Sequence, residues 1–150
     1  MIAVKTLRAI LKAFPGVEAV NVKLFRTEAE LDQVIKDLTG WLLVGIVPSS
    51  DTQAISNNNV FESEQAIVYI IQKTDHGDQD EEDAINGIEL AQQKIFDLKM
   101  YLYEIATNHD HVFHPYLKQL ELNTLHTDPE YNFLGCDGYS LSFVLKTNWF

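Results

Sequence analysis

Three histidines in the second half of the chain are the first candidates for chemistry. His109, His111 and His114 lie within six residues, with Asp110 among them. A metal site needs imidazole nitrogens that converge on one point, and this spacing suits neither one face of a helix nor one face of a strand. A cation near the end of a helix is favoured by the helix dipole without any metal. We therefore predict structural or solvated histidines, and the sequence leaves open whether they bind a metal.

A run of acidic residues is the second candidate, in this case for calcium. Asp78, Asp80 and Glu82 alternate as in an EF-hand loop, and Glu89 falls at the twelfth position of that loop. The sixth position requires glycine for a sharp turn, and here it holds Asp83. Negative charge is also favourable at the start of a helix. We therefore predict a helix N-terminus here rather than a calcium site.

The single cysteine, Cys136, is the third candidate, as a nucleophile. It lies beside Asp137, and a neighbouring carboxylate raises the pKa of a thiol rather than lowering it. We therefore predict a structural cysteine. The sequence holds no G-x-S-x-G motif, no glycine-rich phosphate loop and no H-E-x-x-H motif. We predict a protein that is not an enzyme, with no catalytic, cofactor-binding or metal-binding residues, no cofactor and no evident small-molecule substrate.

The charge balance is strongly acidic and argues against two classes of partner. The 150 residues carry 11 Lys and Arg against 22 Asp and Glu, a formal net charge of -11. Such a surface repels phosphate backbones and anionic lipids, so we expect neither sequence-specific nucleic-acid binding nor a membrane partner. No apolar run approaches the roughly 20 residues that span a bilayer, and residues 1–11 lack the pattern of a signal peptide. With no internal disulfide available, we expect a soluble protein of a reducing compartment.

The elements that would position these residues follow from hydrophobic periodicity and from turn residues. Helices are predicted where apolar residues recur every three to four positions, and strands where they alternate or run together. Predicted helices cover 2–14, 27–38 and 80–108, and predicted strands cover 19–25, 41–47, 60–73, 117–125, 131–134 and 139–145. The polar segment 48–59 is predicted to be a mobile surface loop. Turns are predicted at Asp128-Pro129 and at Cys136-Asp137-Gly138.

The longest predicted helix carries an apolar heptad seam along its whole length. Seven positions spaced by four and three residues are all apolar, namely Ala84, Ile88, Ala91, Ile95, Leu98, Leu102 and Ile105. In a chain with this many strands, we predict that the seam packs on its own sheet rather than on a second copy. Trp41 is predicted to belong to the core, and the pair Trp149-Phe150 is the better candidate for a partner contact.

The order of these elements predicts one α+β domain over residues 1–150. We expect a mixed or mainly antiparallel sheet with helices packed on one face, the longest of them over about 80–108. The stretch from 19 to 126 also has the βαββαβ order of a split β-α-β unit.

The layout resembles the tail terminator, or tail completion, proteins of long-tailed bacteriophages. The resemblance is carried by the short helix 2–14, the strand ending in Ala66-Ile-Val-Tyr-Ile-Ile-Gln-Lys73, the helix 80–108 that follows it, and the pair of strands at the end of the chain. It implies a non-enzymatic structural protein whose subunits form a ring, often a hexamer, that joins the tail tube to the head connector. The implied partners are further copies of the chain and other phage tail or connector proteins. The implied location is the bacterial cytoplasm during assembly and then the virion.

The resemblance leads to one further hypothesis, and an alternative function stands beside it. An acidic ring lumen would let DNA pass without binding it, which suits the net charge of -11. The alternative function is a ferredoxin-like ligand-binding or regulatory domain, expected to be a dimer with a concave apolar pocket.

Overall fold

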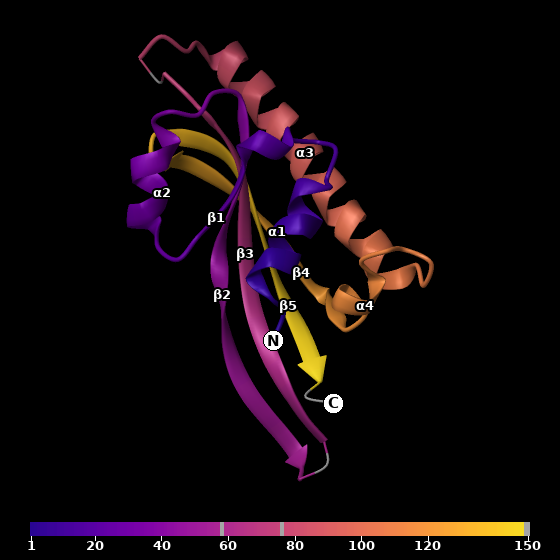
Figure 1. Cartoon of the computed structure of the whole chain (residues 1–150). Coiled ribbons are helices and arrows are strands. Elements are labelled where there is room, and N and C mark those ends of the chain that lie inside the picture. The colour runs from indigo at the N-terminus through magenta and orange to yellow at the C-terminus, as the bar shows by residue number, and fades with distance from the viewer. Residues whose placement is uncertain (58, 76, 149–150) are drawn as a thin grey trace.

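The chain folds as a five-stranded mixed sheet in the order β1-β2-β3-β5-β4 (Figure 1). The computed structural model describes residues 1–57, 59–75 and 77–148. The strands are β1 (Val22–Phe25), β2 (Trp41–Ser56), β3 (Asn59–Lys73), β4 (Leu120–Phe133) and β5 (Cys136–Asn148). The helices are α1 (Val4–Lys12), α2 (Glu28–Ile35), α3 (Glu81–Thr107) and α4 (His114–Leu117), with a short 3-10 helix at Ala19–Asn21. This architecture confirms the predicted α+β class.

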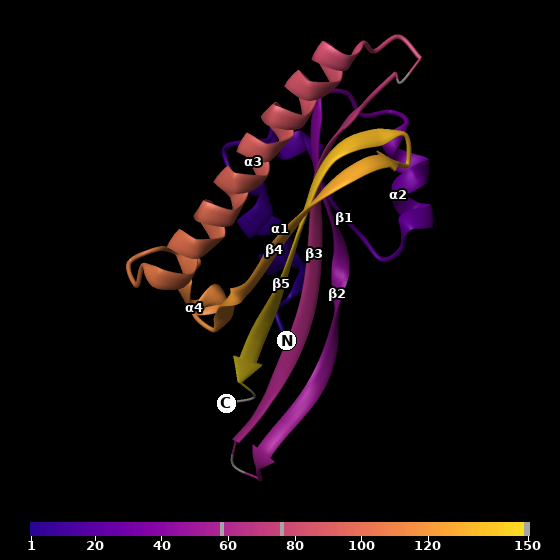
Figure 2. The same cartoon turned by 180° about the vertical axis from the view of Figure 1, so that it is seen from behind.

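Helices cover both faces of the sheet, whereas the sequence predicted helices on one face. Leu43 and Ile70 point to the face that α1 and α3 cover, and their neighbours Leu42 and Ile71 point to the face that α2 covers. All four side chains are fully buried. The centre of the sheet is thus apolar on both sides, and the second side needs its own cover. The amphipathic α2 supplies that cover, and Figure 2 shows it on the side of the sheet away from α3.

The first crossover differs from the predicted split β-α-β unit. β1 and β2 are direct neighbours and run parallel, with Val22 opposite Leu43 and Phe25 opposite Ile46. In a split unit another strand would lie between them. All other pairings in the sheet are antiparallel. The βαββαβ order is therefore present along the chain, but the sheet is not ferredoxin-like.

The longest helix matches its predicted range closely, since α3 spans Glu81–Thr107. Asp80 caps it by accepting a hydrogen bond from the Asp83 backbone N–H at 2.8 Å. The acidic run therefore lies at a helix N-terminus, as predicted. From Ala91 onward the seam packs on the sheet, but Ile88 is 49% exposed. The first turns of α3 thus stand away from the strands.

The segment predicted as a mobile loop, 48–59, forms paired strand instead. β2 continues to Ser56 and pairs with β3 from Ser49 opposite Gln65 to Ser56 opposite Asn59. The described parts of these strands form a hairpin that projects beyond the body of the protein (Figure 1). We call residues 47–56 and 59–65 the arm; Asn58 lies outside the described residues. The sequence of the arm predicts a loop because both of its faces are largely polar. Backbone hydrogen bonds between its two strands nevertheless form, since they do not require apolar side chains.

The last two strands are longer than predicted and their turn lies elsewhere. β4 continues through Asp128-Pro129. The sheet tolerates Pro129, which has no backbone N–H to donate, because β4 is an edge strand with a partner on one side only. The chain reverses at Leu134 and Gly135, which have φ angles of 53° and 80°. Cys136 already belongs to β5, so the predicted turn at Cys136-Asp137-Gly138 is wrong. Leu141, Phe143 and Leu145 alternate along β5 and are all buried.

Candidate functional site

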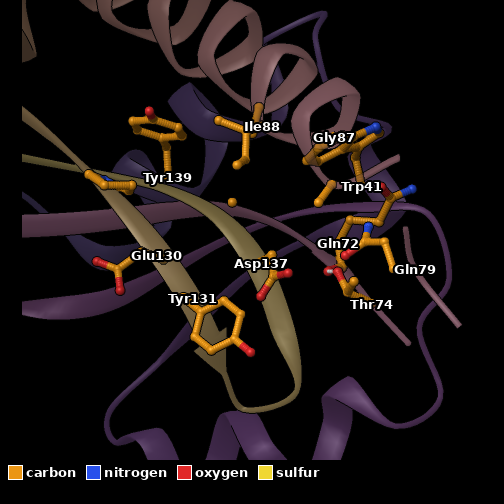
Figure 3. Close-up of a pocket in the computed structure, with 14 residues that line it drawn as sticks. Trp41, Gln72, Thr74, Gln79, Gly87, Ile88, Glu130, Tyr131, Asp137 and Tyr139 are labelled. Atoms are coloured by element: carbon orange, nitrogen blue, oxygen red, sulfur yellow. Dashed lines mark hydrogen bonds between the residues drawn. The ribbon is translucent and has the colours of Figure 1, made fainter. Parts of the chain in front are cut away.

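A groove lies between the first turns of α3 and the end of the sheet. The helix presents Ala84, Gly87 and Ala91 there, and β5 presents Gly138. A cavity of about 330 Å³ remains between the helix and the sheet at these residues. Figure 3 shows Ile88 pointing from α3 into this space.

The walls of the groove are mainly apolar and its rim is polar. Trp41 and Tyr139 form the walls with Ile88, and Lys94 Nζ lies 5.5 Å from the centre of the Trp41 ring. Tyr139 is held by Gln92, whose side-chain amide donates to the Tyr139 hydroxyl at 2.9 Å. The predicted core residue Trp41 is therefore only half-buried and belongs to this wall. Such walls suit an apolar ligand or side chain.

Two carboxylates, Glu130 and Asp137, lie at the rim. Asp137 accepts a hydrogen bond from the Asn132 backbone N–H at 2.7 Å, which ties it to the β4–β5 turn. Within the described lining of the groove, no Ser, Thr or Cys is bonded to a histidine or carboxylate. The arrangement can bind an apolar group.

No protein-family model and no curated protein matches this chain. In addition, none of the described helices is both long and apolar enough to span a membrane.

The outer edge of the arm is the second notable surface. β1 pairs with β2 only from Leu43 to Ile46. Beyond that point, β3 is the only described strand that pairs with β2, so the other edge of residues 47–56 is open. This stretch contains no Lys or Arg. Edge strands of soluble proteins are commonly protected by such charges or by a cover.

A shallow hollow adjoins this open edge on the face that carries α2. The helix covers only part of the face, and Ile46, Ile67 and Val144 remain half-buried. They line a hollow of about 580 Å³ together with residues of the arm. The edge and an adjoining apolar face are thus available together.

Two buried carboxylates stiffen the arm, and the sequence patterns did not reveal them. Glu62 is 8% exposed and accepts hydrogen bonds from Ser50 Oγ at 2.6 Å and Thr52 Oγ1 at 2.9 Å. Glu64 is 2% exposed and accepts the Ile2 backbone N–H at 2.6 Å. The arm is therefore tied both across its strands and to the beginning of α1.

The three candidate histidines do not converge as a group. His109 Nδ1 and His114 Nε2 lie 3.0 Å apart, but His111 Nδ1 accepts the Phe113 backbone N–H at 3.1 Å. His126 lies on β4 and pairs with Asp128 at 3.0 Å. In the part of the chain that the structure describes, no three His, Cys, Asp or Glu side chains gather to hold a metal ion.

The remaining candidates have structural surroundings. Asp78, Asp80 and Glu82 do not gather with Glu89 into any such group among the described residues. Cys136 is fully buried on the α2 face, and burial, with a smaller contribution from Asp137, raises the pKa of its thiol while Lys73 lowers it. A buried thiol with a raised pKa is a poor nucleophile. The pair Trp149-Phe150 lies outside the described residues.

Only one feature of these surfaces has a signal in the local sequence pattern. Gly87 interrupts the middle of a helical pattern, and a glycine there disfavours the helix relative to alanine. That signal points to a close approach or a gap on the helix face. Nothing in the local pattern indicated that Gly138 lies opposite it.

Proposed function

We propose that this chain is a structural subunit that assembles with further copies into a ring through the open edge of its arm. The observation that carries the proposal is the open edge of residues 47–56, which pairs with no other described strand and carries no basic side chain, its only interruptions being Pro48, Asp51 and two register irregularities. An exposed edge of this kind is a template for pairing with another chain. A contact between two different surfaces of the same chain closes into a ring when the rotation between copies allows it.

The order of the elements supports a role like that of phage tail terminator or tail completion proteins. A short helix comes first, a long strand leads directly into a long helix, and two strands joined by a tight turn end the chain. The net charge of -11 favours a passage that does not retain DNA. The proposed partners are further copies together with tail and connector proteins, in the bacterial cytoplasm and then in the virion.

Lysines placed on the open edge test the proposal. Gln53 and Ala54 are both exposed on the arm, and Gln53→Lys/Ala54→Lys should prevent strand pairing between copies. Sedimentation velocity over a concentration series should show oligomers for the unchanged chain and monomers for this variant. Negative-stain micrographs should show rings only for the former.

A matched control adds the same charge elsewhere. Asn86 and Gln93 are exposed on α3, so Asn86→Lys/Gln93→Lys should assemble like the unchanged chain. If the unchanged chain stays a monomer at every concentration, the proposed function is wrong. If both variants lose assembly equally, net charge and not the arm edge controls it.

A second candidate function, ligand binding, is favoured by the groove beneath α3. Its volume of about 330 Å³ lies at the lower end of small-molecule sites. Because a Cβ at Gly87 meets nothing within 4 Å, Gly87→Leu should fill the groove without disturbing the sheet. A panel of small apolar ligands should raise the melting temperature of the unchanged chain and not of this variant if the groove binds them.

A further inference from the structure

Two histidine ring nitrogens face each other where α3 ends. His109 Nδ1 and His114 Nε2 are 3.0 Å apart, and the two rings are nearly perpendicular, at 86°. His109 is exposed and His114 is half-buried, so the space between them opens to solvent. We propose that this pair binds a divalent transition-metal ion, with Cu²⁺ preferred.

The backbone fixes the orientation and tautomer of one member of the pair. His114 Nδ1 lies 2.8 Å from the carbonyl oxygen of Ile105. A carbonyl only accepts, so His114 Nδ1 carries the hydrogen and the lone pair of a neutral ring is on Nε2, towards His109. A histidine that ligates a metal commonly donates its other N–H to a carbonyl in this way.

The segment that carries the pair is held by its own hydrogen bonds. The His114 backbone N–H donates to the His111 carbonyl at 3.0 Å, and the His111 backbone N–H donates to the Asn108 carbonyl at 3.1 Å. The Asp110 backbone N–H donates to Asn108 Oδ1 at 3.0 Å. The chain therefore positions both rings before any ion arrives, which lowers the entropy cost of binding.

The separation of the nitrogens indicates the type of ion. Imidazole nitrogens bind Zn²⁺ at about 2.0–2.1 Å, and similar lengths place two nitrogens 3.0 Å apart at an angle of about 90–95° around the metal. That angle corresponds to neighbouring positions of a tetragonal or octahedral ion rather than to a tetrahedron. Tetragonal nitrogen sites suit Cu²⁺ and Ni²⁺, and Cu²⁺ binds most strongly in the general order of divalent ions.

Water completes the proposed coordination, since no third protein ligand gathers there among the described residues. In the metal-free neutral pair, His109 Nδ1 donates its hydrogen to His114 Nε2. On metal binding that hydrogen moves to His109 Nε2, so both facing nitrogens present lone pairs.

Calorimetric titration of the untagged full chain with Cu²⁺ alone tests the site. We expect saturable binding of one ion. The affinity should be at least about tenfold weaker in His109→Ala and in His114→Ala, because even the loss of a residue that only supports a metal ligand commonly lowers metal affinity by that factor. The matched control is His126→Ala, whose ring faces Asp128 on β4 and which should bind normally. Electron paramagnetic resonance should show two equatorial nitrogens, and only one in His109→Ala.

The two variants separate a loss of metal binding from a loss of structure. His114→Ala also removes the bond to the Ile105 carbonyl, whereas His109→Ala breaks no bond to the backbone among those described. An unchanged affinity in His109→Ala, an equal loss in His126→Ala, or no binding by the unchanged chain would each overturn the proposal. None of these results bears on the arm, so the ring proposal stands or falls separately.

Discussion

Replacing Gly138 by alanine should strongly destabilise the fold, because β5 passes too close to β3 at this residue for any side chain. An ideal Cβ at residue 138 would overlap the carbonyl oxygen of Ile70. It would also lie 2.8 Å from Ile71 Cα and 2.9 Å from the Ile70 carbonyl carbon. These are backbone atoms of a central strand, and they cannot rotate away as a side chain would.

The expected cost combines overpacking with damage to the sheet. Overpacking a core costs about 1–3 kcal/mol, and separating the strands loses at least one hydrogen bond of about 0.5–1.5 kcal/mol. Gly138→Ala should therefore lower the free energy of unfolding by about 1.5–4.5 kcal/mol. Urea unfolding followed by circular dichroism measures it.

Gly87→Ala is the matched control, because it makes the same chemical change across the groove. A Cβ at Gly87 meets nothing within 4 Å, and alanine is favoured over glycine inside a helix by about 0.5–1 kcal/mol. This variant should be more stable than the unchanged chain. If both variants shift stability in the same direction, or Gly138→Ala costs less than about 1 kcal/mol, the close approach of the strands has been misjudged.

Two further predictions concern buried polar groups. Glu64→Leu removes the acceptor that the Ile2 N–H has at 2.6 Å, and it should lower the free energy of unfolding in urea by about 1–3 kcal/mol. Glu64→Gln keeps an acceptor and should cost less. Equal costs in the two variants would show that the hydrogen bond is unimportant. Burial raises the pKa of Tyr101 to about 12, and its hydroxyl donates to the Ile10 carbonyl at 2.7 Å. The folded state thus holds this proton more tightly than the unfolded state, so stability should fall as the pH rises from about 10 towards 12; Tyr101→Phe should reduce that fall, and an identical pH dependence in both proteins would contradict the assignment.

The long elements could be predicted from the sequence because their periodicity survives in the fold. Ala91, Ile95 and Leu98 lie on one helix face, and all three are buried on the sheet. The helix predicted over 27–38 also begins where α2 does, and Thr27 caps it there, since its Oγ1 accepts the Glu30 N–H at 3.4 Å. Local patterns of this kind are set by neighbours in the chain.

The candidate surfaces could not be predicted, since they depend on contacts between distant residues. Gly87 and Gly138 form the groove only because α3 crosses the sheet at that point. The arm is polar on both faces, so it lacks the alternation by which half-buried strands are found. The histidine pair arises from the path of the chain between α3 and α4, which the spacing of His109 and His114 does not determine.

The central position of β3 has a mechanical consequence. This strand is paired with β2 from Asn59 to Gln72 and with β5 from Phe61 to Lys73, so it is bonded on both sides from the arm to the groove. Ladder bonds run across the strands, and tension applied along the arm would therefore load many of them in shear at once. A pull at right angles would instead peel them apart one after another. A molecule held by its arm should thus resist axial tension far better than sideways tearing.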